Sequence, residues 1–542
     1  MSRVLGPVER GVYRVIGVKE DAEQTWKRYL GAVLVVTVAS VVFTFLVLRF
    51  QDKLPFQNQL NPNHFPGLSP DLSMNTAISF ATNTNWQNYA GESTMSYLSQ
   101  MLGLVMHNFL SAATGIALAI ALIRGLARRS ASTIGNFYVD TTRSILYILL
   151  PISILGAIIL MSQGVIQNFD QYTTAHTLSG ATQTIAQGPF ASQEIIKNLG
   201  NNGGGPFNAN SAHPFENPNG FTNAFTIWSL LVIPVALTFT FGKMVGNLKQ
   251  GLTILAAMGG ILIVLTGVAM VAEQTGNPAL TAQGVTQSST DQQSGGNMEG
   301  KEVRNGVLQS AQFAASTTGT STGSVDSSHD SYTPIGGMVP LLSIQLGEIT
   351  PGGVGAGLYG MLMFAIIGVF VAGLMVGRTP EYLGKKINAR EVKFAALAIL
   401  ILPLSILGLT AISVLTKQGQ AGPLNTGAHG FSEILYAFSS VTGNNGSAFA
   451  GLTGNTVYYN TLLMTGMWLG RYLFVIPILA VAGSMVQKKV VPESAGTFRT
   501  DTPLFAGLLV GVVIIIGALT FFPALALGPI VEHFQLYAGH YH

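Results

Sequence analysis

The chain contains no cysteine, which excludes disulfide bonds and thiolate metal sites. It also has few charges: only 9% of its 542 residues are Asp, Glu, Lys or Arg, whereas soluble proteins carry about 25%. Apolar residues make up 48% of the chain, and the mean hydropathy is +0.43. The scarcity of charge argues against a set of soluble domains and indicates a polytopic membrane protein.

The chain also lacks the short motifs of common catalytic chemistry. It has no Asp-Lys-Thr-Gly phosphorylation motif and no Walker A motif, since the Gly-rich stretch Gly200–Gly205 is not followed by Lys-Ser/Thr. His107, His213, His329 and His429 are scattered, without paired or HExxH spacing, so we expect no histidine metal site. We therefore expect no catalytic site and no organic cofactor, and any ATP chemistry must belong to another polypeptide.

Long apolar runs are abundant. A helix needs about 20 predominantly apolar residues to cross the hydrocarbon core of a bilayer. The stretches that meet this requirement predict nine membrane spans: 29–48, 97–123, 142–162, 222–242, 251–271, 356–377, 394–415, 458–484 and 504–528.

The loops between these spans alternate in charge. One set consists of short loops. Together with the N-terminal segment 1–28, these loops hold 20 of the 27 Lys and Arg residues. The other set is longer, rich in Gly, Asn, Gln, Thr and Ser, and holds 15 of the 24 Asp and Glu residues. Because basic loops remain in the cytoplasm, we predict the N-terminus inside and the tail ending in His540-Tyr541-His542 outside.

One small polar motif occurs four times in the outward loops. The last residues of its copies are 118, 120 and 123 positions apart. Such evenly spaced loops at membrane depth can close into a ring of backbone carbonyls that replaces the hydration shell of a cation. The copies are Asn83-Thr84-Asn85, Asn201-Asn202-Gly203, Ser321-Thr322-Gly323 and Asn444-Asn445-Gly446.

A short apolar stretch, too short to span, precedes each motif. We predict that these stretches, 71–81, 191–199, 308–318 and 431–441, are re-entrant half-helices. Asp71 follows Pro70, and Ser192 and Ser432 are expected at N-cap positions. The C-terminal end of each half-helix then points at its motif, where the negative end of the helix dipole favours a cation.

The predicted fold is an all-α polytopic membrane protein. Four pseudo-repeats of span, pore half-helix, filter loop and span surround one central pore, and a C-terminal span is added. The predicted divisions are 1–28 (basic N-terminus), 29–123, 142–242, 251–377 and 394–484 (repeats 1 to 4) and 504–528 (the extra span).

Several longer motifs resemble those of KdpA, the potassium-binding subunit family of the bacterial Kdp transporters, over nearly the whole chain. They are Thr82-Asn-Thr-Asn-Trp-Gln87, Asn201-Asn-Gly-Gly-Gly205, Phe207-Asn-Ala-Asn-Ser-Ala-His-Pro-Phe-Glu-Asn-Pro218, His329-Asp-Ser331, Gly377-Arg-Thr-Pro-Glu-Tyr-Leu-Gly-Lys-Lys-Ile387 and Asn444-Asn-Gly-Ser-Ala-Phe-Ala-Gly451.

The resemblance implies a K⁺-channel-like fold with one filter, in a multi-pass protein of the bacterial inner membrane. It implies that the chain selects K⁺ for ATP-driven, high-affinity uptake, with ATP hydrolysed by a separate P-type ATPase subunit (KdpB-like). It further implies a C-type accessory subunit (KdpC-like) and a small single-span subunit (KdpF-like).

Two features depart from the family pattern. The family normally begins with one further span, giving ten, whereas this chain starts at the basic stretch before the second. Asn201 stands where the family usually has Thr. Since backbone carbonyls are expected to coordinate the ion, we expect this exchange to be tolerated.

The candidate site residues follow from these patterns. The twelve residues of the four triplets are predicted to bind K⁺. Gln87 is predicted to support the filter, and Trp86 is expected to pack against its neighbours.

Arg471 lies within an apolar span, where a charge is costly and usually functional, so we predict that it forms a plug or gate below the filter. Acidic residues expected near the entrance are Glu216, Asp326, Asp330, Glu348 and Glu433.

Two other functions remain open from the residues. A stand-alone K⁺ or Na⁺ channel or symporter of the same four-repeat superfamily would use the same filter. An intramembrane enzyme would need a nucleophile and base, or a carboxylate or histidine cluster, within a span, and the spans have almost none. In the pump-subunit interpretation, segments 378–393 and 485–503 are predicted to dock the ATPase subunit.

Overall fold

The computed structural model describes residues 2–375, 377, 379–491 and 498–540. Within this part of the chain, nine helical stretches are long and apolar enough to span a membrane, as predicted. They are α2 (Trp26–Arg49), α6 with the π-helical turn before it (Ser99–Ala127), α7 to α8 (Phe137–Ser162), α10 (Gly220–Met244), α11 (Leu248–Gln274), α15 (Ala356–Met375), α16 (Ala389–Leu415), α19 to α20 (Val457–Met485) and α21 to α22 (Pro503–Tyr537).

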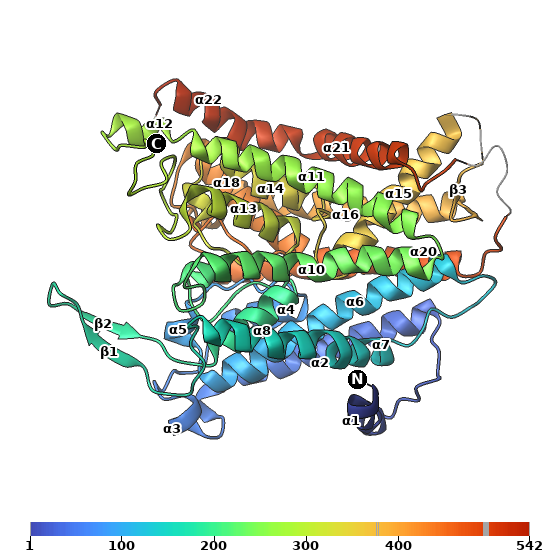
Figure 1. The fold of residues 1–542 in the computed structure, drawn as a ribbon, viewed down its shortest axis with the longest axis horizontal. Coiled ribbons are helices and arrows are strands. Elements are labelled where there is room, and N and C mark those ends of the chain that lie inside the picture. Colours follow the sequence, from blue (N-terminus) through green and yellow to red (C-terminus); the bar gives the residue numbers. More distant parts are fainter. Residues whose placement is uncertain (1, 376, 378, 492–497, 541–542) are drawn as a thin grey trace.

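The spans run side by side, and the connecting segments gather at their two ends (Figure 1). The N-terminus lies at one end and the C-terminus at the other, as an odd number of spans requires. The hairpin β1 (Thr173–His176) with β2 (Thr182–Ile185) extends from the same end as α3 (Gln57–Leu60) and α12 (Pro278–Ala282). The amphipathic helix α1 (Ser2–Ile16) and strand β3 (Glu381–Tyr382) lie at the opposite, basic end.

A short helix precedes each polar motif. These pore helices are α4 (Pro70–Ala81), α9 (Phe190–Leu199), α13 (Gly306–Gly319) and α18 (Gly427–Gly443). Each packs against the first span of its own repeat: α4 on α2, α9 on α8, α13 on α11 and α18 on α16.

The pore helices also link neighbouring repeats in a circle. In three of the repeats the second span contacts the pore helix of the next repeat: α6 contacts α9, α10 contacts α13, and α19 of repeat 4 returns to contact α4. Between repeats 3 and 4 the contact is made by α14 (Pro334–Gln345), which packs on α18. This circular packing places the four motifs around a common axis.

Both predicted N-caps are wrong. The N-cap of α9 is Pro189, and α18 begins one turn earlier than expected, with Thr426 as its N-cap. Helix α4 begins at Pro70, one residue before the predicted start, and its N-cap is Ser69. Ser192 and Ser432 lie inside their helices, where their hydroxyls donate to backbone carbonyls three and four residues back. A serine can make this internal bond as readily as a cap, so its position alone does not locate a helix start.

Repeat 3 contains a helix that was not expected from the sequence. The residues before the predicted span 356–377 were assigned to an outer loop, but they form α14 and then a loop over residues 346–355 that leads into α15. This loop packs tightly on α6: a Cβ added to Gly115 would lie 2.1 Å from the carbonyl oxygen of Val354, and one added to Gly355 would lie 2.0 Å from the carbonyl oxygen of Gly115. Glycine at both positions permits this close approach of two backbones.

The remaining short elements connect these helices. They are α5 (Gly91–Thr94), α17 (Lys417–Gln420), strand β4 (Lys385–Lys386), which pairs with β3, and the 3-10 turns Gln51–Lys53, Asn210–Ala212 and His329–Ser331. Three further π-helical stretches, Ser144–Leu149, Leu469–Leu473 and Ala526–Ile530, interrupt spans. Arg378 and residues 492–497 of the predicted docking segments, and Tyr541 and His542 of the predicted outer tail, lie outside the described residues.

Candidate ion-binding site

The four motifs adopt the same unusual backbone. In each, the first and third residues have positive φ angles and the middle residue does not. In repeat 4, for example, φ is 60° at Asn444 and 101° at Gly446. When the sign of φ alternates between successive residues, the N–H groups turn to one side of the backbone and the carbonyls turn to the other. We call these four triplets the strips.

Hydrogen bonds fix which side the N–H groups face. In every strip, the middle N–H donates to the carbonyl of the residue five positions earlier, near the end of the pore helix. The distances are 2.9 Å for Thr84 to Ser79, 2.8 Å for Asn202 to Lys197, 2.9 Å for Thr322 to Thr317 and 2.9 Å for Asn445 to Ser440. The N–H groups therefore point back to the helix ends, and the carbonyls point away from them.

The strips touch one another in a closed ring. A Cβ on Gly203 would lie 2.0 Å from the Thr322 carbonyl oxygen, one on Gly323 would lie 2.2 Å from that of Asn445, and one on Gly446 would lie 1.9 Å from that of Thr84. At the fourth junction, Asn85 replaces glycine, and its side-chain amide donates to the Gly203 carbonyl at 3.3 Å and to Asn108 Oδ1 at 2.6 Å.

Side chains at the inner end of the strips close a second ring. Asn83 Nδ2 donates to the Asn201 carbonyl at 2.7 Å, and Ser321 Oγ donates to the Asn444 carbonyl at 3.2 Å. The other two junctions run through hydroxyls: Asn201 Nδ2 donates to Thr322 Oγ1 and Asn444 Nδ2 to Thr84 Oγ1, both at 3.0 Å. Asn201 thus joins repeat 2 to repeat 3 through its side chain.

The middle carbonyls are left without partners. In the described part of the chain, the carbonyl oxygens of Thr84, Asn202, Thr322 and Asn445 accept no hydrogen bond. All four residues are fully buried. Buried backbone carbonyls are almost always paired, so four equivalent unpaired ones around one axis indicate a binding site for a cation.

Gln87 braces the outer end of the ring. Its side-chain oxygen accepts from the Gly205 N–H at 3.0 Å, and its amide donates to the Gly205 carbonyl at 3.1 Å. These paired bonds join the chain after the first strip to the chain after the second. Trp86 is buried in an apolar cluster with Phe438 and donates its indole N–H to Asn88.

A buried ion network lies directly behind the second strip. The Lys197 ammonium is 2.7 Å from Glu194 and 2.5 Å from Glu216, and all three side chains are inaccessible to solvent. Burial, and then the charge of Glu194, raise the pKa of the Glu216 carboxyl well above its ordinary value, although Lys197 opposes this. The network holds the end of α9 against the loop that follows the strip.

Arg471 lies on the inner side of the ring, within the π-helical stretch of the fourth repeat. It is 6% exposed. Its guanidinium donates to the Tyr359 hydroxyl at 3.5 Å and to the Ser111 carbonyl at 3.4 Å, which are weak contacts. No carboxylate forms an ion pair with it in the part of the chain that the structure describes.

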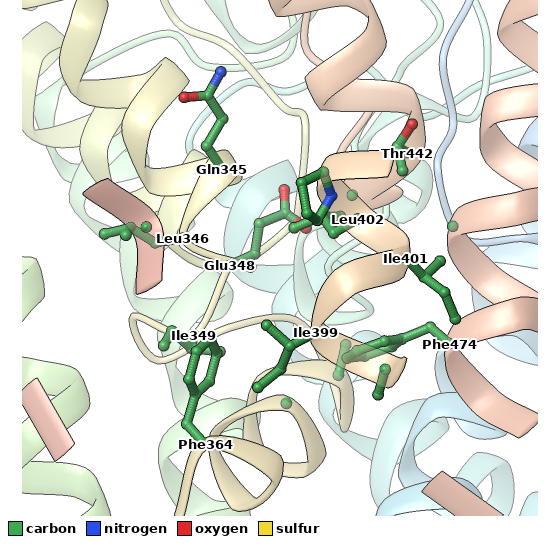
Figure 2. Close-up of a pocket in the computed structure, with 18 of the residues that line it drawn as sticks. Gln345, Leu346, Glu348, Ile349, Phe364, Ile399, Ile401, Leu402, Thr442 and Phe474 are labelled. Carbon is green, nitrogen blue, oxygen red and sulfur yellow. The ribbon is translucent and has the colours of Figure 1, made fainter. Parts of the chain in front are cut away.

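A cavity of about 70 Å³ adjoins the inner end of the fourth strip. Its wall includes Asn444, Arg471, Tyr359 and Glu348, together with apolar side chains of α15, α16 and α21. Figure 2 shows Glu348 pointing into this space from the loop that breaks repeat 3. The cavity is large enough to hold water or a small ion.

The predicted acidic entrance is corrected in two respects. Glu348 lies at this inner cavity, not at the outer mouth, because the repeat 3 chain turns back into the protein after α14. Glu216, Asp326 and Glu433 are on the outer side but are buried at 1% exposure or less, so they are not solvated loop carboxylates. Of the five, only Asp330 is partly exposed.

The predicted docking segment 378–393 is partly occupied by internal contacts. Lys385 is buried, and its ammonium donates to the carbonyls of Gly125 at 3.0 Å, Met485 at 2.8 Å, and Arg128. It therefore caps the inner ends of α6 and α20 and is not available to a partner.

Comparison with known proteins places this geometry in a family. Residues 1–534 match the family described as potassium-transporting ATPase A subunit. Curated relatives named potassium-transporting ATPase potassium-binding subunit include those of Methylobacterium nodulans, 57% identical over 99% of this chain and 92% of the relative, and Solibacter usitatus, 56% identical over 99% and 93%. That of Herminiimonas arsenicoxydans is 54% identical over 98% and 92%.

Among solved structures, the crystal structure of the potassium transporter TrkH from Vibrio parahaemolyticus has a similar fold. The TM-score is 0.52, and the match covers 85% of this chain and 86% of that one. At 15% identity the likeness concerns the fold alone.

The buried network yields a prediction about stability. Replacing Lys197 by Met removes the only cation between two buried carboxylates in the described network, so we expect the free energy of unfolding to fall by about 3–5 kcal/mol. The thermal midpoint of the purified protein in detergent measures the effect. Lys417→Met, at an exposed position on α17, is the matched control. Equal midpoints for the two variants would contradict a supporting role for the network.

Proposed function

This chain belongs to the potassium-transporting ATPase A subunit family, and from that membership and the closed ring of strips we propose that it selects K⁺ for ATP-driven uptake. It is the potassium-binding subunit of a K⁺-transporting ATPase complex and a multi-pass membrane protein. The observation that carries the proposal is the set of four buried, unpaired middle carbonyls, which the strips turn toward one axis.

The ring suits a bare monovalent cation for electrostatic reasons. Carbonyl dipoles replace the water that the ion loses, and the C-terminal ends of α4, α9, α13 and α18 add their negative dipole ends. The twelve residues of the strips form the proposed site: Asn83, Thr84, Asn85, Asn201, Asn202, Gly203, Ser321, Thr322, Gly323, Asn444, Asn445 and Gly446. Gln87 supports them from the outer side.

The energy for transport is supplied outside this chain. Neither a phosphorylation motif nor a Walker A motif occurs in the sequence, so ATP is bound and hydrolysed by a P-type ATPase subunit of KdpB type. A KdpC-like accessory subunit and a KdpF-like single-span subunit complete the proposed assembly in the bacterial inner membrane. No organic cofactor is required by this chain.

Arg471 acts as an electrostatic barrier on the inner side of the ring. Its guanidinium is buried beside the cavity that adjoins the fourth strip and has only weak hydrogen bonds. A fixed positive charge at this place opposes the free passage of a cation from the ring. The complex therefore holds K⁺ without leaking it until the partner subunit drives the transfer.

Purification of the complex tests the proposal most directly. We expect the chain to co-purify with a P-type ATPase subunit, and K⁺ to stimulate ATP hydrolysis by the assembly. The stand-alone channel or symporter, whose fold resembles that of the TrkH structure, is the second candidate. K⁺ flux through the purified chain in liposomes, with no partner and no ATP, would favour that candidate instead.

A substitution within the ring tests selectivity. Gly323→Ala places a Cβ 2.2 Å from the Asn445 carbonyl at a φ of 79°, so the strip must shift. We expect the apparent K⁺ affinity to fall tenfold or more, which corresponds to about 1.4 kcal/mol, and the preference for K⁺ over Rb⁺ and Na⁺ to weaken. Ion-stimulated ATP hydrolysis by the complex measures both.

Gly507→Ala is the control for this variant, because a Cβ at Gly507 of α21 meets nothing within 4 Å. Ion discrimination that is the same in Gly323→Ala, Gly507→Ala and the unmodified complex would refute the assignment of the strips.

A second substitution tests the barrier. Arg471→Ala removes the positive charge, and we expect passive Rb⁺ flux through the complex without ATP to rise tenfold or more. Arg471→Lys, which keeps the charge, should leak far less. If the unmodified complex, Arg471→Ala and Arg471→Lys show equal passive Rb⁺ flux while ATP hydrolysis remains coupled to K⁺, Arg471 is not a barrier.

A further inference from the structure

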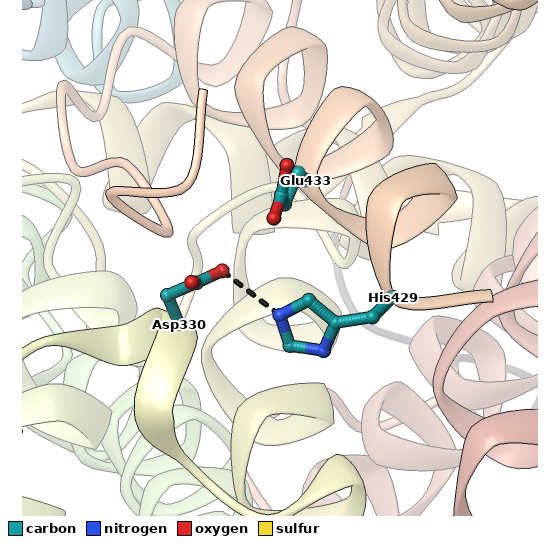
Figure 3. Close-up of side chains that lie close together, drawn as sticks. All are labelled: Asp330, His429 and Glu433. Carbon is teal, nitrogen blue, oxygen red and sulfur yellow. Dashed lines mark hydrogen bonds and ion pairs between the residues drawn. The ribbon is translucent and has the colours of Figure 1, made fainter. Parts of the chain in front are cut away.

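Side chains with metal-binding chemistry meet on the outer side of the protein, apart from the ring. Asp330 lies in the turn that follows the third strip, and His429 and Glu433 lie on the first turns of α18. One donor atom from each lies within 4.8 Å of the others. Figure 3 shows the Glu433 carboxylate pointing toward the paired Asp330 and His429 side chains.

The His429 ring is held between two carboxylates. Its Nε2 is 3.0 Å from Asp330 Oδ1, and its Nδ1 is 2.7 Å from Glu532 Oε1 on α22. A histidine that donates one ring N–H to a carboxylate presents its other nitrogen to a metal, with the tautomer and the ring orientation fixed. Glu532 is placed to do this, which leaves Nε2 on the side of Asp330 and Glu433.

Glu433 is also fixed in place. It is 1% exposed. The Leu424 N–H donates to its Oε2 at 3.0 Å, and the Asn425 amide donates to its Oε1 at 2.7 Å. Gly451 leaves room for the two carboxylates to converge, since a Cβ there would lie 2.2 Å from Glu433 Oε1 and 2.9 Å from Asp330 Oδ1.

The cluster has an excess of negative charge. Three carboxylates, those of Asp330, Glu433 and Glu532, surround one imidazole, and in the described residues no Lys or Arg forms an ion pair with them.

We propose that Asp330, His429 and Glu433 bind one divalent transition-metal ion of the Zn²⁺ type, with Glu532 orienting the histidine. One imidazole and two carboxylates form a ligand set that Zn²⁺ accepts, and water fills its open position. With metal–ligand bonds of about 2.0–2.1 Å, donors in a tetrahedral site lie roughly 3.4 Å apart. The three donor atoms lie within 4.8 Å of one another, so metal binding would draw them closer together.

Access to this site is through an outer cavity. It measures about 280 Å³, and Asp330, Asn425, His429 and Glu532 are among the residues that line it. Water and a hydrated metal ion can therefore reach the ligands from the outer side without passing the ring.

The ion would join three separate parts of the chain: the turn after the third strip, the pore helix before the fourth, and the C-terminal span. His329, the residue before Asp330, begins a chain of hydrogen bonds that reaches the ring. His329 Nδ1 is 2.9 Å from the Tyr436 hydroxyl, which is 2.8 Å from Ser447 Oγ, and Ser447 Oγ donates to Asn445 Oδ1 at 2.5 Å. Metal binding thus braces the outer side of the third and fourth strips.

The test uses the purified complex after treatment with a chelator. Equilibrium dialysis against Zn²⁺, followed by elemental analysis, should find one tightly held ion per chain, and Zn²⁺ should raise the thermal midpoint. Co²⁺ in its place should show the visible absorption of a tetrahedral nitrogen and oxygen site. These readouts do not depend on ATP hydrolysis, so their failure would leave the proposed K⁺ function untouched.

Variants assign the ligands. His429→Gln and Glu433→Gln should lose the ion, and Glu532→Gln should weaken binding by about 10- to 100-fold, because it only orients the ring. His533→Gln, one residue away on α22 and outside the cluster, should bind as the unmodified protein does. Failure of the unmodified complex to retain Zn²⁺, or equal retention by His429→Gln and His533→Gln, would overturn the proposal.

Discussion

Four carbonyl groups that point into the protein without a hydrogen-bond partner are the constraint on which the rest of the structure depends. Unpaired backbone at membrane depth costs several kcal/mol per group unless protein or a cavity surrounds it. The protein meets this condition by turning every middle N–H of the strips back onto a helix end and by sealing the strips to one another. The pore helices, their circular packing on neighbouring repeats and the glycines at three of the four junctions all serve that arrangement.

Much of this arrangement could be predicted from the sequence because it rests on local signals. The spans follow from the length of the apolar runs, and the pore helices follow from apolar stretches too short to cross a bilayer. Equal spacing of the polar triplets predicted that they are equivalent, and their shared alternation of φ agrees with that equivalence. The helix starts were less predictable, because the hydroxyls of Ser192 and Ser432 donate to backbone carbonyls three and four residues earlier and do not cap the helix.

Features that depend on contacts between distant segments could not be predicted. Glu348 was expected at the outer mouth because α14 is too short to be recognised as a span, so the residues before 356 were assigned to an outer loop. In the structure α14 carries the chain inward, and Glu348 lies at the inner cavity. Asp330, His429 and Glu532 are separated by about a hundred residues at each step, and no motif spacing links them. The packing of α22 and the turn after the third strip against α18 brings them together.

The four strips share one backbone but differ in side chains, and they belong to a single polypeptide. In a homotetrameric channel, one substitution changes the filter at four places at once and preserves its symmetry. Here the sequence of each strip can change independently. The first strip already ends in Asn85, where the other three strips end in glycine. The electric field around the axis therefore lacks fourfold symmetry. At the inner end of the ring the cavity adjoins the fourth strip, so the surroundings that an ion meets there are also unequal around the axis.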